Sequence, residues 1–359
     1  MINLDQTKIY QKYDTGQVAK SIELLADQVR QVLSEARLIK IPREYSKINQ
    51  VVVNGMGGSN VGAGIVKAAL SSRIKAPLIL TPGYEVPHYV GKNTLYVISS
   101  YSGNTEEPLS VYGEVKSRGA KILAITCDSK KNKLADLMLK ENIPGYIFKP
   151  EYNPSGQPRL GQGYMIFGAT VLLAKAGLFE LKIEEMEDII ASMEIWDREL
   201  RPLVKVKHNK AKQLAIKLYD KQIVAIAAEF LIGNLRILRN QFSETGKNFA
   251  SYLTLPELNH YSMEGLSFPK SNQKNLAFLF FDSELYHPRI TKRARLTKVV
   301  ARKNNITVVS HKLIGQNKLK QAFEMFQLGS WVSFYLGMLN QVNPAKITWV
   351  DWFKKKLGD

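Results

Sequence analysis

The sequence predicts an α/β protein with two domains, each a mainly parallel, doubly wound sheet between layers of helices. The 359 residues exceed what one hydrophobic core usually spans and suit two domains of ordinary size. Short, uninterrupted apolar segments alternate with amphipathic helical segments as far as residue 150, and a second set begins near residue 205. This alternation is typical of three-layer αβα domains.

The first half supplies the elements of one such domain. Apolar residues at helical spacing before residue 45, such as Val18, Ile22 and Leu25, predict one long helix that packs across the first domain. The β-branched segment 48–54 ends in glycines and precedes a helical segment, which predicts a buried strand, a tight turn and a helix. Further strands are expected at 76–82, 94–100, 120–128 and 145–150, with helices at 106–119 and 133–142.

The second half has the same order of elements, although no sequence repeat aligns by eye. A markedly apolar helix at 164–178 is expected in the core or between the domains. Strands follow at 222–229, 275–284 and 306–313, with a basic helix at 288–304, an aromatic-rich amphipathic helix and a closing helix. The chain thus divides into an N-terminal helical segment (1–45), a first domain (46–185), a helical connector (186–204) and a second domain (205–359).

The composition indicates a globular protein of a reducing compartment. Hydrophobic residues make up 45% and charged residues 23% of the chain, and the single cysteine, Cys127, excludes an internal disulfide framework, so we expect the cytoplasm. No apolar stretch has the length of a signal region or a membrane span. The net charge of +18 would suit anionic partners, but no nucleic-acid module accompanies it, so we expect neither nucleic acid nor membrane as a partner.

Residues 100–105, SYSGNT, form a candidate phosphate loop between a buried strand and a helix. Ser100, Ser102 and Thr105 offer three hydroxyls, and Gly103 permits a tight backbone path. Phosphates bind to such hydroxyls and to backbone N–H groups at the carboxyl ends of parallel strands. The same residue types also form ordinary strand-to-helix turns, so composition alone leaves both readings open.

Two motifs together resemble a known family. The segments GMGGSNVGAG and SSYSGNTEEPLS, joined by YEVPHYVGKNTLYVIS, are similar to the first sugar isomerase (SIS) domain of the bifunctional phosphoglucose/phosphomannose isomerases. The resemblance implies two SIS-type domains and an enzyme of glycolysis and gluconeogenesis that interconverts glucose 6-phosphate and fructose 6-phosphate, and also uses mannose 6-phosphate. It further implies a phosphate site formed by Gly57, Gly58, Ser59, Ser100, Ser102 and Thr105.

Isomerisation through a cis-enediol needs a carboxylate that moves a proton, a cation beside the enediolate and groups that open the sugar ring. The segment FSETGKNFASYLTLPELNHYSMEGL carries Glu244, Lys247, Glu257 and His260. Its residue types and spacing alone also fit surface residues. Its resemblance to the family's glutamate-bearing helix and PE-x-x-H sequence implies that Glu244 is the base and that His260 opens the ring.

The remaining candidates also come from the resemblance. Arg159, in GQPRLGQG, matches the arginine that stabilises the enediolate. Lys354, in VDWFKKKL, matches a lysine that assists ring opening, and we expect it to face inward at the edge of the helix's apolar face. Thr348 matches a hydroxyl that admits the mannose epimer. The family's active sites lie at the interface of a homodimer, so the resemblance implies a homodimer and leaves open which of the two subunits supplies His260 to each site.

The chain departs from the family's pattern around these groups. Ser243 and Thr245 flank the base where asparagines are usual, and Tyr261 follows the histidine in place of asparagine. These changes bear on the orientation of the base and on the relative use of glucose and mannose phosphates.

We expect neither a metal nor another cofactor. The remaining histidines have no metal-ligand spacing, and an enediol mechanism with an arginine needs no Lewis acid. A non-catalytic sugar-phosphate sensor and another sugar-phosphate isomerase or amino-sugar enzyme of this fold remain alternatives. A sensor would be free to lose Glu244, His260 or Lys354, and the chain has all three.

Overall fold

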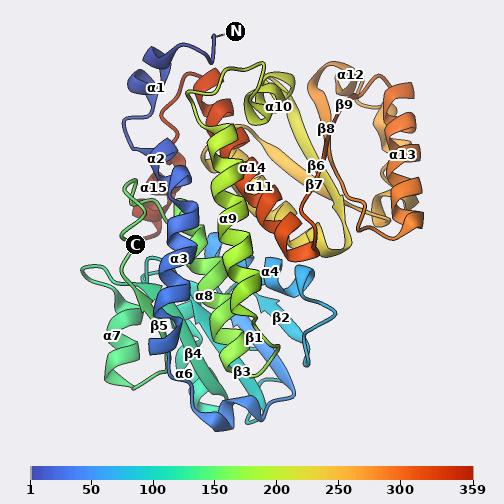
Figure 1. Ribbon diagram of the computed structural model, residues 1–359. Helices are drawn as coiled ribbons and strands as arrows, with labels where there is room; N and C mark the ends of the chain where they lie inside the picture. The colour runs from blue at the N-terminus through green and yellow to red at the C-terminus, as the bar shows by residue number, and fades with distance from the viewer. Residues whose placement is uncertain (1, 359) are drawn as a thin grey trace.

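The computed structural model describes residues 2–358 and contains two wholly parallel sheets (Figure 1). The first sheet has the order β2-β1-β3-β4-β5, and its strands are β1 Gln50–Asn54, β2 Leu78–Thr81, β3 Thr94–Ser99, β4 Lys121–Cys127 and β5 Gly145–Phe148. The second has the order β7-β6-β8-β9, and its strands are β6 Gln222–Ala228, β7 Ala250–Leu255, β8 Leu276–Asp282 and β9 Thr307–Lys312. The predicted fold class is confirmed.

The two sheets share one topology. In each, the first strand in the chain lies between the second and the third, and the fourth follows the third. The first sheet adds a fifth strand. This common order supports a structural duplication of the two halves, which their sequences do not show.

Helices cover both faces of the first sheet. Alternate strand residues point to opposite faces, so Val51 and Val53 join the core beneath α4 (Gly58–Ala69) and α8 (Gln162–Lys175), whereas Val52 packs on the other face. The second face is covered by α5 (Glu106–Ser110), α6 (Tyr112–Ser117) and α7 (Lys133–Lys140). The single helix expected at 106–119 is thus two short helices.

The second sheet has α10 (Lys210–Leu218) and α11 (Ile232–Glu244) on one side and α13 (Pro288–Lys303) on the other (Figure 1). The short α12 (Asn272–Asn275) leads into β8. Behind α11 runs α14 (Lys318–Leu339), which is buried along nearly its whole length. The expectation of an amphipathic helix there was wrong, because α14 packs against α2, α9, α10 and α11 at once.

The two halves meet through the helix that follows the first strand of each sheet. These helices, α4 and α11, cross so closely that a Cβ on Gly233 would lie 2.2 Å from the carbonyl oxygen of Gly64. Only glycine permits this approach. Because α4 begins at the glycine turn and α11 ends at Glu244, the crossing fixes the predicted phosphate site relative to the predicted base.

The N-terminal segment differs from its prediction. In place of one helix there are three, α1 (Thr7–Tyr13), α2 (Val18–Glu23) and α3 (Leu25–Glu35). The carboxylate of Asp14 accepts the backbone N–H groups of Val18 and Ala19 at 2.7 and 2.9 Å and so starts a new helix. Helices α1 and α2 lie against α14, and only α3 lies against α8 and α9 (Ile183–Leu200).

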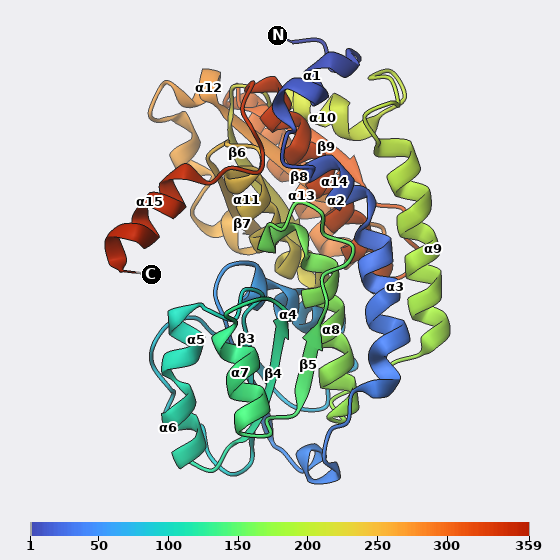
Figure 2. The same cartoon turned by 90° about the vertical axis from the view of Figure 1, so that its left-hand side faces the viewer.

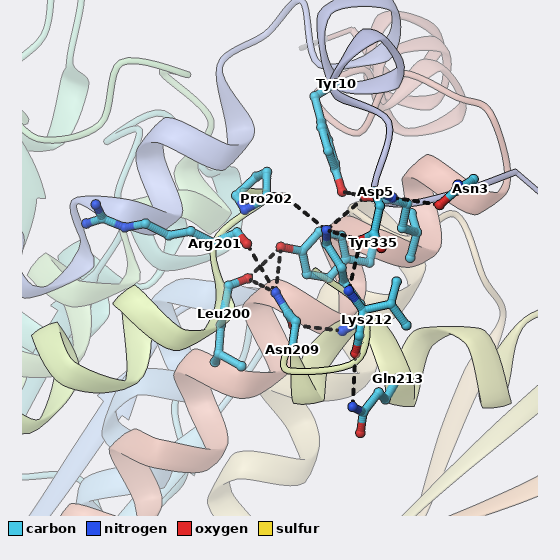
Figure 3. Close-up of polar contacts among 12 residues, drawn as sticks. Asn3, Asp5, Tyr10, Leu200, Arg201, Pro202, Asn209, Lys212, Gln213 and Tyr335 are labelled. Atoms are coloured by element: carbon cyan, nitrogen blue, oxygen red, sulfur yellow. Dashed lines mark hydrogen bonds and ion pairs between the residues drawn. The ribbon is translucent and has the colours of Figure 1, made fainter. Parts of the chain in front are cut away.

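A buried lysine fastens the N-terminal segment to the second half (Figure 3). The Lys212 ammonium donates to the carbonyl oxygens of Leu4 and Pro202, both at 2.8 Å, and to Asp5 Oδ1 at 3.2 Å. It also lies 5.7 and 5.6 Å from the ring centroids of Tyr10 and Tyr335. Burial lowers the pKa of Lys212, and the Asp5 carboxylate opposes that shift.

One strand was missed. Residues 250–255 form β7 at the edge of the second sheet, where four of the six are only half-buried. Within residues 2–358, no helix has both the length and the apolar character that crossing a membrane requires.

Candidate active site

The candidate phosphate loop is held by its own hydroxyls. Ser100 Oγ donates to Thr105 Oγ1 at 3.0 Å and accepts the backbone N–H of Gly103 at 3.1 Å. Gly103 has a φ of 69°, and a Cβ there would lie 1.6 Å from Asn132 Oδ1. Glycine is therefore required, and the loop has a single tight path.

The glycine turn after β1 lies against this loop. Ser59 Oγ accepts the backbone N–H of Tyr101 at 3.0 Å, and Ser99 Oγ donates to the Ser59 carbonyl oxygen at 2.7 Å. Gly57 has a φ of 49° and open space around the position of a Cβ. Ser59 and Ser100 thus hold the loops together; Ser100 is buried, whereas Ser59, Ser102 and Thr105 are all partly exposed, with Ser102 Oγ accepting the Asn104 N–H at 3.4 Å.

Arg159 comes from the segment that packs against the same loops. It lies in a 3₁₀ turn, Pro158–Leu160, and Gly161 behind it approaches the Tyr101 ring so closely that a Cβ would lie 2.1 Å away. The Tyr101 hydroxyl accepts from Asn153 Nδ2 at 2.8 Å. Tyr101, in the centre of the phosphate loop, therefore connects that loop to the arginine-bearing segment.

Arg159 and Glu244 form an ion pair between the two halves. Arg159 is buried, and its Nη1 lies 3.8 Å from Glu244 Oε2 at the end of α11, while its Nε donates to Thr245 Oγ1 at 3.2 Å. Burial lowers the pKa of Arg159, and the Glu244 and Asp351 carboxylates oppose that shift. A guanidinium nevertheless stays charged at neutral pH. Thr245, at one of the positions where the chain departs from the family's pattern, thus accepts a hydrogen bond from the arginine.

A C-terminal strap, residues 340–346, closes one side of this cluster. Arg159 Nη2 donates to the carbonyl oxygens of Pro344 and Ala345 at 2.8 and 2.7 Å. Asn340 Nδ2 donates to the Gly246 carbonyl oxygen at 2.8 Å. On its outer side the strap contacts the N-terminal segment, where a Cβ on Gly16 would lie 2.3 Å from the Ala345 Cβ. Sequence reasoning missed the strap, because its acceptors are main-chain carbonyls.

Lys247 is a second cation beside the base. Its ammonium donates to the main-chain oxygen of Glu244 and, at 3.3 Å, to that of Pro344. Burial, together with the positive charge of Arg159, lowers the pKa of Lys247 to about 8. The sequence placed Lys247 in the catalytic segment without giving it a role.

Within residues 2–358, the side chains of His260 and Lys354 make no hydrogen bond or ion pair with this cluster. His260 is exposed at the end of the turn Glu257–His260 after β7. Lys354 lies on α15 (Thr348–Leu357), every residue of which is exposed, and the helix projects from the body of the molecule (Figure 2). The expectation that Lys354 faces inward is therefore wrong for a single chain. Thr348 is exposed as the first residue of α15.

The other histidines have separate environments. His287 caps α13 through Nδ1, which accepts the backbone N–H of Arg289 at 3.1 Å. His311 lies in β9 with its Nε2 3.6 Å from Glu324 Oε1. Within residues 2–358, no three His, Cys, Asp or Glu side chains gather as metal ligands would.

Sequence comparison relates the chain to curated enzymes. The profile of the bacterial phospho-glucose isomerase C-terminal SIS domain matches residues 207–357. A bifunctional phosphoglucose/phosphomannose isomerase from Caldicellulosiruptor bescii is 31% identical over 350 residues, which cover 95% of this chain and 98% of that enzyme. An enzyme of the same name from Aquifex aeolicus is 26% identical over 318 residues, covering 88% and 93%.

Solved structures agree on the fold. A glucose-6-phosphate isomerase like protein from Thermus thermophilus covers 99% of both chains with a TM-score of 0.58 and 18% identity. Glucosamine-6-phosphate deaminase from Thermotoga maritima covers 92% of this chain and 95% of its own with a TM-score of 0.62 and 14% identity. These identities support the fold alone, but the sequence match to the Caldicellulosiruptor enzyme extends over nearly the whole of both chains. The chain therefore belongs to the bifunctional phosphoglucose/phosphomannose isomerase family.

Proposed function

We propose that this protein reversibly isomerises glucose 6-phosphate and fructose 6-phosphate, and also mannose 6-phosphate, through a cis-enediol. The observation that carries the proposal is the Arg159–Glu244 pair at 3.8 Å, next to a loop with partly exposed hydroxyls. A carboxylate beside a permanent cation is what proton transfer through an enediolate needs. The family's activity supports the same substrates.

Each residue of the cluster has a distinct part in the proposed reaction. The 6-phosphate binds to Ser102 and Thr105 and to the glycine turn. Glu244 removes the proton from C2 of the open-chain aldose and returns it to C1, while the hydroxyl proton of O2 passes to O1, which yields the ketose. The Arg159 charge stabilises the enediolate between these steps, since a buried guanidinium needs no reorganisation as the negative charge develops. His260 and Lys354 open the sugar ring before the proton transfer.

The ring-opening groups support a homodimer with the active site at the subunit interface. His260 is followed by Tyr261, which is 55% exposed, and Phe268 nearby is 67% exposed. On α15, Trp349 and Trp352 are 81% and 56% exposed. Exposed aromatic patches of this kind usually mark protein contacts. A second copy that covers them would bring His260 of the partner subunit to the cluster around Glu244.

The cytoplasm is the proposed location. Cys127 is the chain's one cysteine and is buried as a free thiol. This fits a compartment that keeps thiols reduced.

A coupled assay of fructose 6-phosphate formation from glucose 6-phosphate and from mannose 6-phosphate tests the activity. We expect turnover of both substrates by the wild type. Glu244→Gln keeps the size of the side chain but removes the base, and we expect kcat to fall by about 10³-fold or more. Full activity of Glu244→Gln would exclude Glu244 as the base. A well-folded wild type that binds sugar phosphates without converting either one would contradict the proposed function and favour a sensor.

A further inference from the structure

Lys247 has no part in the reaction outlined above, yet it touches the residue that carries the proton. It lies three residues after Glu244, with a φ of 53°, in the turn that leaves α11. This backbone conformation is uncommon for a residue with a side chain. With this backbone conformation, the Lys247 ammonium donates a hydrogen bond back to the main-chain oxygen of Glu244.

The contact is favourable for a defined physical reason. Glu244 is the last residue of α11, and the final carbonyl groups of a helix have no partner within the helix. They also form the negative end of the helix dipole. A cation there satisfies an unpaired acceptor and interacts favourably with the dipole at the same time.

Lys247 and Arg159 share one support. Both donate to the Pro344 carbonyl oxygen, at 3.3 and 2.8 Å. Arg159 uses four of its five N–H groups on Gln157, Thr245 and the strap. The strap therefore holds the arginine firmly, and Lys247 connects the same strap to the backbone of the base.

We propose that Lys247 is a positioning residue of the isomerase, which locks the end of α11, and with it Glu244, onto the C-terminal strap. The inference rests on the proposed function. A base that shifts by about 1 Å can cost about 10²-fold in rate, so the loss of this lock reduces kcat without removing any reacting group. Substrate affinity depends on the phosphate loop and changes little.

The turn has other supports, so a variant at Lys247 should still fold. Thr245 bonds Arg159, and Asn340 bonds the Gly246 carbonyl oxygen at 2.8 Å. The matched control is Lys217, which is exposed on α10 and whose side chain makes no hydrogen bond or ion pair within residues 2–358. Lys217→Met removes one positive charge from the same half of the chain.

The pH dependence gives a readout that a purely structural role would not affect. The charged groups that face Lys247 are Glu244 on α11 and Arg159 on the turn before α8, and Asp351 on α15 faces Arg159. With its pKa near 8, Lys247 is charged at neutral pH and loses its charge as the pH rises through 8. We therefore expect wild-type kcat to fall on the alkaline side, and Lys247→Arg, which stays charged, to lack that fall.

The experiment compares kcat, KM and thermal unfolding for the wild type, Lys247→Met, Lys247→Arg and Lys217→Met. The measurements run from about pH 6 to about pH 10, a range that brackets the lowered pKa of Lys247. We expect Lys247→Met to lose about 10²-fold in kcat with KM within about twofold. Lys247→Arg should recover most of kcat, and Lys217→Met should match the wild type.

Wild-type kcat in Lys247→Met would overturn the inference, as would a change in KM alone. An equal loss in Lys247→Met and Lys247→Arg with the alkaline fall retained would also overturn it. Failure of the proposed function looks different, because the wild type itself would then be inactive.

Discussion

The two groups of predicted catalytic residues have opposite environments. The inner cluster, which comprises the phosphate loop, Arg159 and Glu244, is assembled within one chain and fixed by hydrogen bonds from both halves. The outer pair, His260 and Lys354, is exposed on a turn and on a projecting helix. Within residues 2–358, one chain brings the phosphate loop, Arg159 and Glu244 together but leaves His260 and Lys354 exposed, a difference that fits the proposed completion of the site by a second copy.

The largest effect should come from breaking the inner cluster at its centre. Arg159→Met removes the charge beside the proposed enediolate, leaves the Ala345 carbonyl without its donor and leaves the Pro344 carbonyl with only the longer bond from Lys247. We expect kcat to fall by about 10³-fold. We also expect the free energy of unfolding to fall by about 3 kcal/mol, because buried acceptors lose their partners. Steady-state kinetics and urea unfolding measure the two effects.

Arg159→Lys is the matched variant for this prediction. It keeps a positive charge but cannot serve the strap, Thr245 and Gln157 together. We expect kcat between those of the wild type and Arg159→Met. Wild-type kcat in Arg159→Met would show that the Arg159–Glu244 ion pair serves only the fold.

A smaller effect should divide the hydroxyls of the phosphate site into two classes. Both Ser59 and Ser102 are partly exposed, but Ser59 accepts the Tyr101 N–H and so joins two loops, whereas Ser102 accepts only the Asn104 N–H of its own loop. We expect Ser102→Ala to raise KM about tenfold through the loss of one hydrogen bond to a charged phosphate, with little change in thermal stability. Ser59→Ala should instead lower the free energy of unfolding by about 1 kcal/mol. Equal effects of both changes on KM alone would contradict this division.

The sequence was sufficient for the parts of the fold with strong local patterns. The β-branched run that ends in Gly55 predicted β1 and the turn into α4 correctly. Prediction from the sequence failed for β7, because Ser251 and Thr254 lie in a half-exposed edge strand and break the apolar pattern. The sequence also showed no sign of the separate helix α1, which Asp14 divides from α2 by accepting the first backbone N–H groups of α2.

The site was harder to predict because its contacts are distant in the sequence. Arg159 and Glu244 meet only because α4 and α11 cross at Gly64 and Gly233. No local pattern encodes that approach, and only the family resemblance suggested the pair. The strap supplies main-chain carbonyls at Pro344 and Ala345, and every residue type has such a carbonyl.

The most direct test of the account is complementation between two inactive variants, Glu244→Gln and His260→Ala, measured by glucose 6-phosphate isomerisation after their subunits are exchanged. If each site takes its histidine from the partner, half of the randomly mixed dimers have one intact site. The account therefore predicts recovery of about a quarter of wild-type activity. Mixtures without subunit exchange serve as the control. If both residues of a site came from the same subunit, exchange would restore nothing, and that result would contradict the division between the inner cluster and the outer pair.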